Sequence, residues 1–276
     1  MNRIAVLGPK GTFTEVATKK YLASQGIKMQ LEYYLSIRST FQAIENGCAM
    51  GVIPIENTLD GFVQIILDLL THSDLKIIHE IVLPIRFTLV ANCNNIKEVT
   101  RVYTQFKAHN QCIDLIEKLG EIEIITTASN STSYEKALNG DRNEAAIIPS
   151  HMLDKNEVFD LVVEDIADSI DNETRFIILS KELNDEDIVS VDWNTLFVVS
   201  NDVDRPGLLC EILNIFSDRG INLRSIISRP RKTGLGNYNF FIDVDGCYQR
   251  DEAVKDAVIK VTEGFDIKIL GSYYRV

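Results

Sequence analysis

Short runs of strand-forming residues alternate with helix patterns through the first two thirds of the chain, and glycine or proline marks most of the changes. The N-terminal end is typical: Arg3–Leu7 favours a strand, Gly8–Gly11 interrupts it, and a helix is expected to run to about Ser24. Thr12 is a good N-cap residue, and Glu15 three residues later predicts a capping box. This alternation favours an α/β fold in which helices join the strands.

The alternation continues to about residue 180. Further helices are expected at Ser39–Asn46, Gly61–Leu70, Ala108–Leu119 and Ser131–Leu138. Further strands are expected at Leu31–Leu35, Met50–Pro54, Leu75–Val82, Arg86–Ala91, near Thr100–Val102, and at Glu123–Thr126, Ala145–Ile148, Val158–Ile166 and Arg175–Ser180. We expect the last two strands to return the chain to the sheet in which it started.

An acidic, polar stretch over residues 182–193 predicts a linker to a second domain. Beyond it, the patterns follow the order β-α-β-β-α-β, which is typical of a ferredoxin-like sandwich of about 80 residues. The helices are expected at Gly207–Asp218 and Asp251–Thr262, and the strands at Thr195–Val199, Leu223–Arg229, Tyr238–Val244 and Asp266–Tyr273, with a turn at Asp202–Pro206 and a loop at Lys232–Gly236. Two domains also suit a length of 276 residues.

The acidic composition limits the partners that the chain can bind. Lys and Arg number 28 against 40 Asp and Glu, a formal charge of −12. Such a protein repels phosphate at long range, so neither nucleic acid nor an anionic membrane is an expected partner. A small anionic substrate remains possible, because it needs only a few local cations or helix N-termini.

The cysteine and histidine spacings do not predict a metal site. No two cysteines have C-x-x-C spacing, and the four histidines lack ligand spacing. We expect free thiols in a reducing compartment. The N-terminus leads directly into a strand pattern, without a signal peptide, and no stretch reaches the roughly 18 apolar residues of a membrane span. These features favour a cytoplasmic location.

Three polar segments lie where open α/β sheets bind ligands, at or near strand ends. Gly8–Phe13 joins a strand to a helix start and suits a carboxylate, although a simple tight turn explains it equally well. Pro54–Thr58 offers an acid, an amide and a hydroxyl, with helix capping as the alternative. Asn172–Phe176 contains Arg175, whose planar guanidinium suits a carboxylate, with a surface strand start as the alternative.

These segments belong to a longer series of motifs. The series comprises GPKGTFTEVA (Gly8–Ala17), PIENT (Pro54–Thr58) with Gly61, STSYEKA (Ser131–Ala137), TRF (Thr174–Phe176), DRPGLL (Asp204–Leu209), GINL (Gly220–Leu223), SRP (Ser228–Pro230), FFIDVDG (Phe240–Gly246) and LGSYYR (Leu270–Arg275). In this order and spacing the sequence resembles the prephenate dehydratase family, with the catalytic part over Arg3 to about Ser180 and an ACT domain over about Asn194 to Arg275.

The resemblance implies a bilobal catalytic domain over 1–181, similar to type II periplasmic binding proteins. Lobe A would comprise about 1–80 plus 158–181 and lobe B about 81–157, with the active site in the cleft between them. The chain would cross to lobe B near Glu80–Leu83 and return near Val158–Ile166. The linker, 182–193, would lead to a regulatory ACT domain over 194–276.

The implied reaction converts prephenate into phenylpyruvate, carbon dioxide and water, a lyase step of L-phenylalanine biosynthesis that needs no cofactor. By analogy, Thr174 donates a hydrogen bond to the departing hydroxyl and Arg175 grips a substrate carboxylate. Glu56 with a raised pKa would be a better general acid than a threonine hydroxyl. The substrate-binding residues are expected to be Lys10, Gly11, Thr12, Asn57, Thr58, Gln105, Ser131 and Phe176.

The resemblance also implies allosteric feedback by L-phenylalanine, held between paired ACT domains of a homodimer or homotetramer. The effector would bind Gly207, Leu208, Leu209, Asn222, Leu223, Ser228, Arg229 and Pro230.

The chain departs from the family pattern at several positions. Thr104–Lys107 stands where the family often has S-H-P-Q, and Phe87 where it often has histidine. In the ACT domain, Ile227–Pro230 replaces E-S-R-P and Gly207–Cys210 replaces G-A-L-V. Three alternatives therefore stay open: an arogenate dehydratase, a prephenate decarboxylase, and an inactive amino-acid-sensing binding protein.

Overall fold

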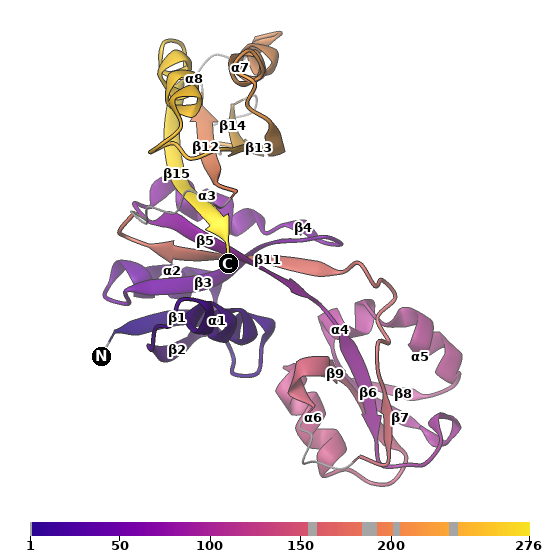
Figure 1. The fold of residues 1–276 in the computed structure, drawn as a ribbon. Helices are drawn as coiled ribbons and strands as arrows, with labels where there is room; N and C mark the ends of the chain where they lie inside the picture. Colours follow the sequence, from indigo (N-terminus) through magenta and orange to yellow (C-terminus); the bar gives the residue numbers. More distant parts are fainter. Residues whose placement is uncertain (1, 154–158, 184–191, 201–204, 232–236) are drawn as a thin grey trace.

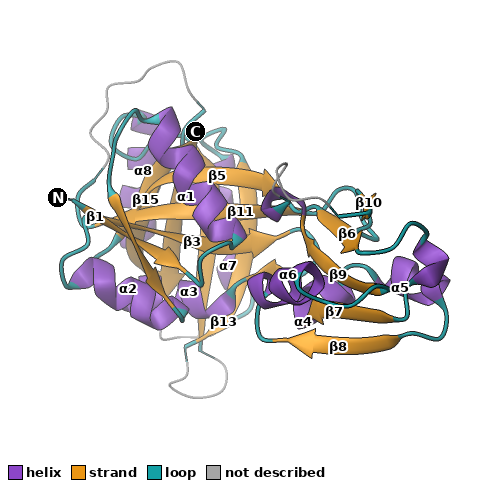
Figure 2. Ribbon diagram, turned by 90° about the horizontal axis from the view of Figure 1, so that it is seen from below, coloured by secondary structure: helices purple, strands orange, loops and turns teal. Residues whose placement is uncertain are grey.

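The computed structural model describes residues 2–153, 159–183, 192–200, 205–231 and 237–276 (Figure 1). These residues form three parts: lobe A, lobe B and a C-terminal domain. Lobe A and the C-terminal domain share one ten-stranded sheet, ordered β13-β14-β12-β15-β5-β11-β3-β1-β2 with β4 on β3. Lobe B has its own five-stranded sheet and lies beside lobe A (Figure 2).

Lobe A is built on one half of the large sheet, from β5 to the edge strand β2. Its elements are β1 (Arg3–Leu7), α1 (Phe13–Ser24), β2 (Gln30–Tyr34), α2 (Ile37–Glu45), β3 (Met50–Asn57), β4 (Gly61–Phe62), α3 (Gln64–His72), β5 (Lys76–Pro84) and β11 (Glu173–Ser180). Strands β1, β2 and β3 are parallel, and β11 lies antiparallel between β3 and β5. Buried aliphatic side chains on both faces fix this order.

The N-terminus of α1 differs from the expectation in one detail. Thr12 caps the helix, as predicted, by accepting the Glu15 N–H. The Glu15 carboxylate, however, accepts the Gly11 N–H at 2.6 Å, whereas a capping box would need the Thr12 N–H. The side chain of Glu15 therefore fixes the loop that precedes the helix.

Lobe B is a smaller sheet, ordered β10-β6-β9-β7-β8, with helices on its faces. Its elements are β6 (Phe87–Ala91), η1 (Ile96–Glu98), β7 (Arg101–Gln105), α4 (Phe106–Asn110), α5 (Ile113–Leu119), β8 (Glu123–Thr127), α6 (Asn130–Leu138), β9 (Glu144–Pro149), η2 (Ser150–Met152) and β10 (Leu161–Val163). Its apolar core is separate from that of lobe A.

The prediction of a single helix over Ala108–Leu119 is wrong. The helix breaks at Cys112, and α5 starts anew because the Asp168 carboxylate accepts the backbone N–H groups of Ile113 and Asp114 at 2.9 and 3.0 Å. Asp168 lies more than fifty residues away in the sequence, so a local pattern does not reveal this cap.

The two crossings between the lobes occur later in the chain than expected. Strand β5 stays in lobe A as far as Pro84, and β6 begins in lobe B at Phe87. The expected return strand, Val158–Ile166, is shorter, and its described part, β10, pairs with β6 of lobe B. Val158 itself lies outside the described residues. The chain therefore re-enters the lobe A sheet only at β11.

The C-terminal domain has the expected β-α-β-β-α-β order. Its elements are β12 (Asn194–Ser200), α7 (Leu208–Ser217), β13 (Leu223–Pro230), β14 (Tyr238–Asp245), α8 (Glu252–Thr262) and β15 (Asp266–Arg275). Both helices pack on one face of its antiparallel strands through a core of their own. Residues 184–191 of the predicted linker, Asn201, residues 202–204 of the predicted turn and the predicted loop 232–236 lie outside the described residues.

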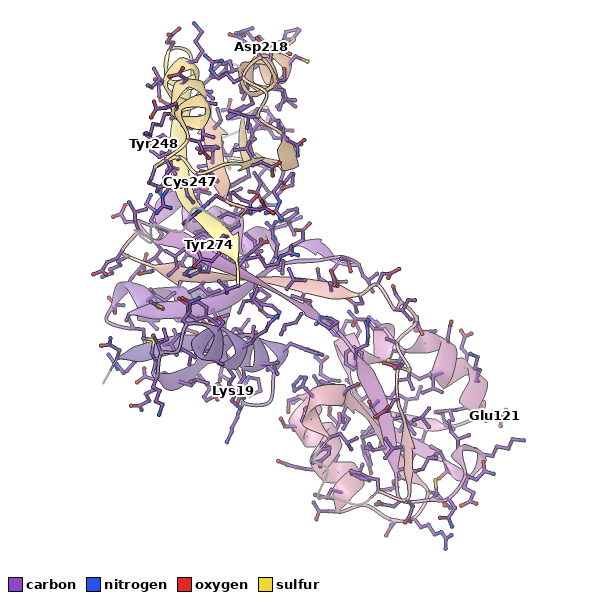
Figure 3. All side chains as sticks on the ribbon, viewed as in Figure 1. Lys19, Glu121, Asp218, Cys247, Tyr248 and Tyr274 are labelled. Carbon is purple, nitrogen blue, oxygen red and sulfur yellow. The ribbon has the colours of Figure 1, made fainter. Side chains whose placement is uncertain are left out.

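Strand β15 joins the C-terminal domain to lobe A. Its last residues, Tyr274 and Arg275, pair in parallel with His79 and Glu80 of β5 (Figure 3). Gly271 permits this close approach, because a β-carbon there would overlap the backbone of Ile77. One continuous sheet therefore crosses the domain boundary.

Two lysines strengthen this junction. Lys268 Nζ donates to the carbonyl oxygens of Leu70, Thr71 and Ser73, at 3.1, 2.8 and 2.7 Å, at the C-terminal end of α3. These oxygens carry the negative end of the helix dipole. Lys76 Nζ donates in the opposite direction, to the Ile269 carbonyl at 2.7 Å.

We predict that Lys268→Met lowers the free energy of unfolding by about 1.5–3 kcal/mol, because hydrogen bonds to a charged group are worth about this much. The thermal unfolding transition, followed by circular dichroism, measures the change. Lys260→Met, at an exposed position of α8, is the matched control and should change stability little. Equal losses of unfolding free energy in the two variants would contradict the role of Lys268.

Candidate active site

A cavity of about 700 Å³ lies between the lobes. Lobe A contributes the loop after β1, the ends of β3 and β11, and the turn before β4. Lobe B contributes the ends of β6 and β7, helix α4 and the start of α6. Its size and its convergent polar groups are those of a small-molecule site.

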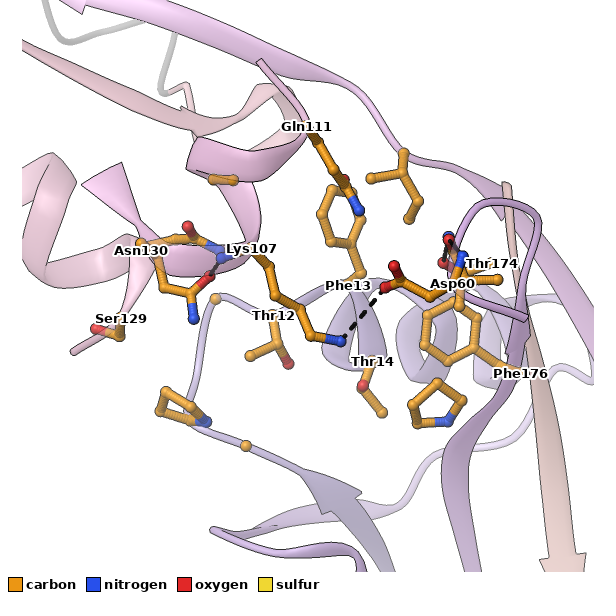
Figure 4. A pocket seen from close by; sticks show the side chains of 18 of the residues that line it. Thr12, Phe13, Thr14, Asp60, Lys107, Gln111, Ser129, Asn130, Thr174 and Phe176 are labelled. Atoms are coloured by element: carbon orange, nitrogen blue, oxygen red, sulfur yellow. Dashed lines mark hydrogen bonds and ion pairs between the residues drawn. The ribbon is translucent and has the colours of Figure 1, made fainter. Parts of the chain in front are cut away.

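The loop after β1 bridges the cleft along one side (Figure 4). Ser131 Oγ of lobe B donates to the Lys10 carbonyl at 3.2 Å, and His151 Nε2 lies 3.2 Å from the Gly11 carbonyl. Gly11 has a φ of +86°, and a β-carbon there would come within 3.0 Å of Ser131 Oγ. A glycine is therefore needed for the loop to lie this close to lobe B.

An asparagine orients the hydroxyl of Thr174. Asn57 Oδ1 accepts the backbone N–H groups of Leu59 and Asp60, at 3.0 and 3.1 Å, which turns its amide nitrogen toward β11. Asn57 Nδ2 then donates to Thr174 Oγ1 at 2.9 Å. Because Thr174 Oγ1 accepts this bond, its own hydrogen is free to donate into the cleft. Among the described residues, no acceptor for that hydrogen is present.

Nine of the eleven residues expected to act in catalysis or substrate binding line the cavity. They are Lys10, Gly11, Thr12, Glu56, Asn57, Gln105, Ser131, Thr174 and Phe176. Thr58 does not line it: its hydroxyl accepts the Glu173 N–H and donates to the Asp171 carbonyl, both at 3.0 Å. Thr58 therefore holds the start of β11 in place beside β3.

Arg175 is the second exception. It lies between Thr174 and Phe176 on β11, and successive side chains of a strand point to opposite faces. Its neighbours line the cleft, while Arg175 points under the cleft floor, with its side chain 11% exposed. The contact of Arg175 with a substrate carboxylate stays a prediction, and the groups that Arg175 contacts here are carboxylates of the protein itself.

The guanidinium of Arg175 is surrounded by carboxylates from three strands. Its Nε lies 3.5 Å from Glu56 of β3 and 3.7 Å from Glu80 of β5, and one terminal nitrogen lies 3.2 Å from Asp243 of β14. Tyr273 of β15 donates its hydroxyl to Asp243 at 2.7 Å. Arg175 therefore connects the cleft wall to the C-terminal domain.

Two further arginines complete this group. Arg224 and Arg275 of the C-terminal domain lie 3.5 and 3.1 Å from Glu80. We call the group the junction cluster. Its members are Glu56, Glu80, Arg175, Arg224, Asp243, Tyr273 and Arg275.

Burial shapes the pKa values of the junction cluster. Burial raises the pKa of the Glu56 carboxyl, and the charge of Arg175 opposes that rise. Asp243 follows the same pattern, with burial raising its pKa and Arg175 opposing. Burial alone would lower the pKa of Arg175, but the surrounding carboxylates reverse this effect and keep it charged. Arg175 is thus the permanently charged centre of the cluster, with Arg224 and Arg275 adding positive charge at Glu80.

Several residues of the cleft had no role assigned to them from the sequence. Phe13 and Phe87 meet edge to face, with ring centroids 6.0 Å apart, and form an apolar wall. Phe62 lies over the Arg175 guanidinium, 5.7 Å from ring centre to Cζ. Asp60 and Lys107 form an ion pair across the cleft mouth. Their residue types carry no specific signal, and only the fold brings them together.

The residues expected to bind an effector lie on α7 and β13. Gly207 caps α7 with a φ of +83°, Leu208 is buried, and Asn222 donates to Asp245 at 2.9 Å. Strand β13 carries Leu223, Ser228, Arg229 and Pro230 along the outer edge of the ten-stranded sheet. The Arg229 guanidinium contacts Asp68 of α3 at 2.9 Å, so it is engaged with lobe A.

Comparisons with known proteins agree with this architecture. Residues 4–184 match the family model "Prephenate dehydratase", and residues 195–263 match the model "ACT domain". A bifunctional chorismate mutase/prephenate dehydratase of Aquifex aeolicus is 34% identical over 98% of this chain and 73% of its own. A prephenate dehydratase of Methanocaldococcus jannaschii is 31% identical over 96% of this chain and 95% of its own.

A solved structure gives the same result. The prephenate dehydratase of Arthrobacter aurescens in complex with L-Phe superposes with a TM-score of 0.84 at 32% identity, over 99% of this chain and 90% of that one. The sequence-based assignment of fold and family is confirmed.

Proposed function

The chain belongs to the prephenate dehydratase family, and we propose that its interlobe cleft performs the dehydration of prephenate through the residues described above. One observation carries the assignment of roles. Asn57 occupies one of the two lone pairs of Thr174 Oγ1, and no described residue accepts the threonine hydrogen, which leaves that hydrogen available to a substrate in the cleft. A donor fixed in advance stabilises charge as it develops on a leaving group.

The reaction needs little from the protein beyond position and a proton. The bond from the ring to the carboxylate breaks, its electrons enter the ring, and the bond to the ring hydroxyl breaks as carbon dioxide and hydroxide depart. Aromatisation drives this step, so binding and orientation supply most of the remaining catalysis. Thr174 donates to the departing oxygen, and a proton turns hydroxide into water.

We assign the proton to Glu56. Glu56 is one of the residues that line the cleft, and burial raises the pKa of its carboxyl, so that carboxyl holds a proton to higher pH than an exposed glutamate. Arg175, directly beneath it, keeps the carboxylate stable once the proton has left. Arg175 is thus a positioning residue in this proposal, in place of the substrate contact that the sequence led us to expect.

The proposal includes regulation by L-phenylalanine. The matched ACT domain and the L-Phe complex of the Arthrobacter aurescens relative support this part. Strand β13 ends the large sheet, and none of the described strands pairs with its outer edge, which suits side-by-side pairing with a second copy of the chain in a homodimer or homotetramer. Five free cysteines are consistent with a cytoplasmic location. No helix among the described residues has the length and apolarity to cross a bilayer.

We predict that Asn57→Asp lowers kcat by about 10²–10³, as loss of one oxyanion donor does. An ionised aspartate only accepts hydrogen bonds, so the Thr174 hydroxyl would turn toward it and away from the substrate. In Thr174→Ala kcat should fall by a similar factor, whereas Thr174→Ser should retain most of the wild-type kcat. Phenylpyruvate absorbance with prephenate as substrate measures all three. Wild-type kcat in Asn57→Asp would contradict the proposed role of Asn57.

The raised pKa of Glu56 predicts a pH dependence. The protonated carboxyl is the active form, so kcat should fall as the pH rises through that raised pKa. Asp243 and Glu80 raise this pKa further, and Arg175 and Arg224 lower it. Glu56→Gln should lower kcat and remove this limb of the profile, whereas Glu56→Asp should keep it. An unchanged limb in Glu56→Gln would assign the titration to another group.

A further inference from the structure

The cleft has few positive charges for a substrate with two carboxylates. Among the described side chains that line it, the cations are Lys10 and Lys107, and the carboxylates are Glu56 and Asp60. Arg175 is held beneath the floor by the junction cluster. With Glu56 ionised the lining is formally neutral, and with the proton that we assign to Glu56 it carries one positive charge, so a dianion needs every local cation that the cleft can offer.

Lys107 is already paired, but only weakly. It lies in the first turn of α4 in lobe B, where Gln105 Oε1 accepts its backbone N–H at 2.7 Å. Its Nζ lies 3.7 Å from Oδ2 of Asp60, in the turn between β3 and β4 of lobe A (Figure 4). Both side chains are largely exposed, at 74% and 57%, so solvent screens this pair.

Resting on the proposed function, we propose that Lys107 binds one of the two carboxylates of prephenate, and that Asp60 competes for Lys107 until the substrate enters. The Asp60 carboxylate occupies in the free protein a position that a substrate carboxylate can take. Exchange is favourable because the contact between Lys107 and Asp60 is long and screened by solvent, whereas a substrate carboxylate can form a direct charge-assisted hydrogen bond with Lys107. Asp60 then returns to solvent at the cleft mouth.

The test is a pair of substitutions that remove opposite charges from one ion pair. Lys107→Gln should raise KM for prephenate about tenfold, the loss expected for one charge-assisted contact. Asp60→Asn should lower KM by about two- to fivefold, because it removes both the competitor and a repelling charge. In both variants kcat should stay close to the wild-type value. Lys118→Gln, at an exposed position of α5 in the same lobe, changes the net charge equally and should leave KM unchanged.

The directions in which KM changes in the two variants distinguish the possible explanations. If the pair only holds the lobes together, both substitutions open the cleft and shift KM in the same direction, which would overturn the proposal. An unchanged KM in Lys107→Gln would also overturn it. Absence of wild-type turnover would instead reject the proposed function, so the two failures are distinguishable. Higher salt should weaken kcat/KM more in the wild type than in Lys107→Gln.

Discussion

The position of Arg175 determines how this molecule is assembled. A buried guanidinium is stable only where anions surround it, and here the anions come from β3, β5 and β14. These strands belong to both lobe A and the C-terminal domain. Separating the two domains removes Asp243 from Arg175 and removes Arg224 and Arg275 from Glu80, so the ion network favours the docked arrangement.

This constraint reaches the cleft because Arg175 separates two residues that line it. Thr174 and Phe176 face the cavity, and Glu56 belongs both to the cavity wall and to the junction cluster. A shift of β14 or β15 relative to β11 must therefore move either the guanidinium or the carboxyl that is proposed to supply the proton. An effector that favours one arrangement of the C-terminal domain can act on the cleft by this route.

Local patterns in the sequence predicted most of the elements. The Thr12 N-cap and the β-α-β-β-α-β order depend on neighbouring residues, so they could be found without the fold. Features that depend on distant partners were missed. The break at Cys112 depends on Asp168, and the sheet to which β10 belongs is determined by the strand it meets.

In the candidate site, too, the features set by neighbouring residues could be predicted and those set by distant residues could not. Motifs placed nine of the expected residues around one cavity, but strand alternation alone could not tell which side of β11 faces the substrate. The direction of Arg175 followed only from the position of Asp243, 68 residues later. Lys107 and Asp60 have ordinary surface residue types and become meaningful only when the two lobes meet.

The most direct test of this account is a titration with L-phenylalanine during phenylpyruvate formation from prephenate, in the wild type and in Asp243→Asn. Circular dichroism with an unchanged melting temperature would first establish that the variant is folded. The account predicts wild-type turnover that responds to L-phenylalanine, and a weakened response in Asp243→Asn because Arg175 loses its anion from β14. An identical response in both proteins would contradict coupling through Arg175, and absence of turnover in the wild type would contradict the assignment of the cleft.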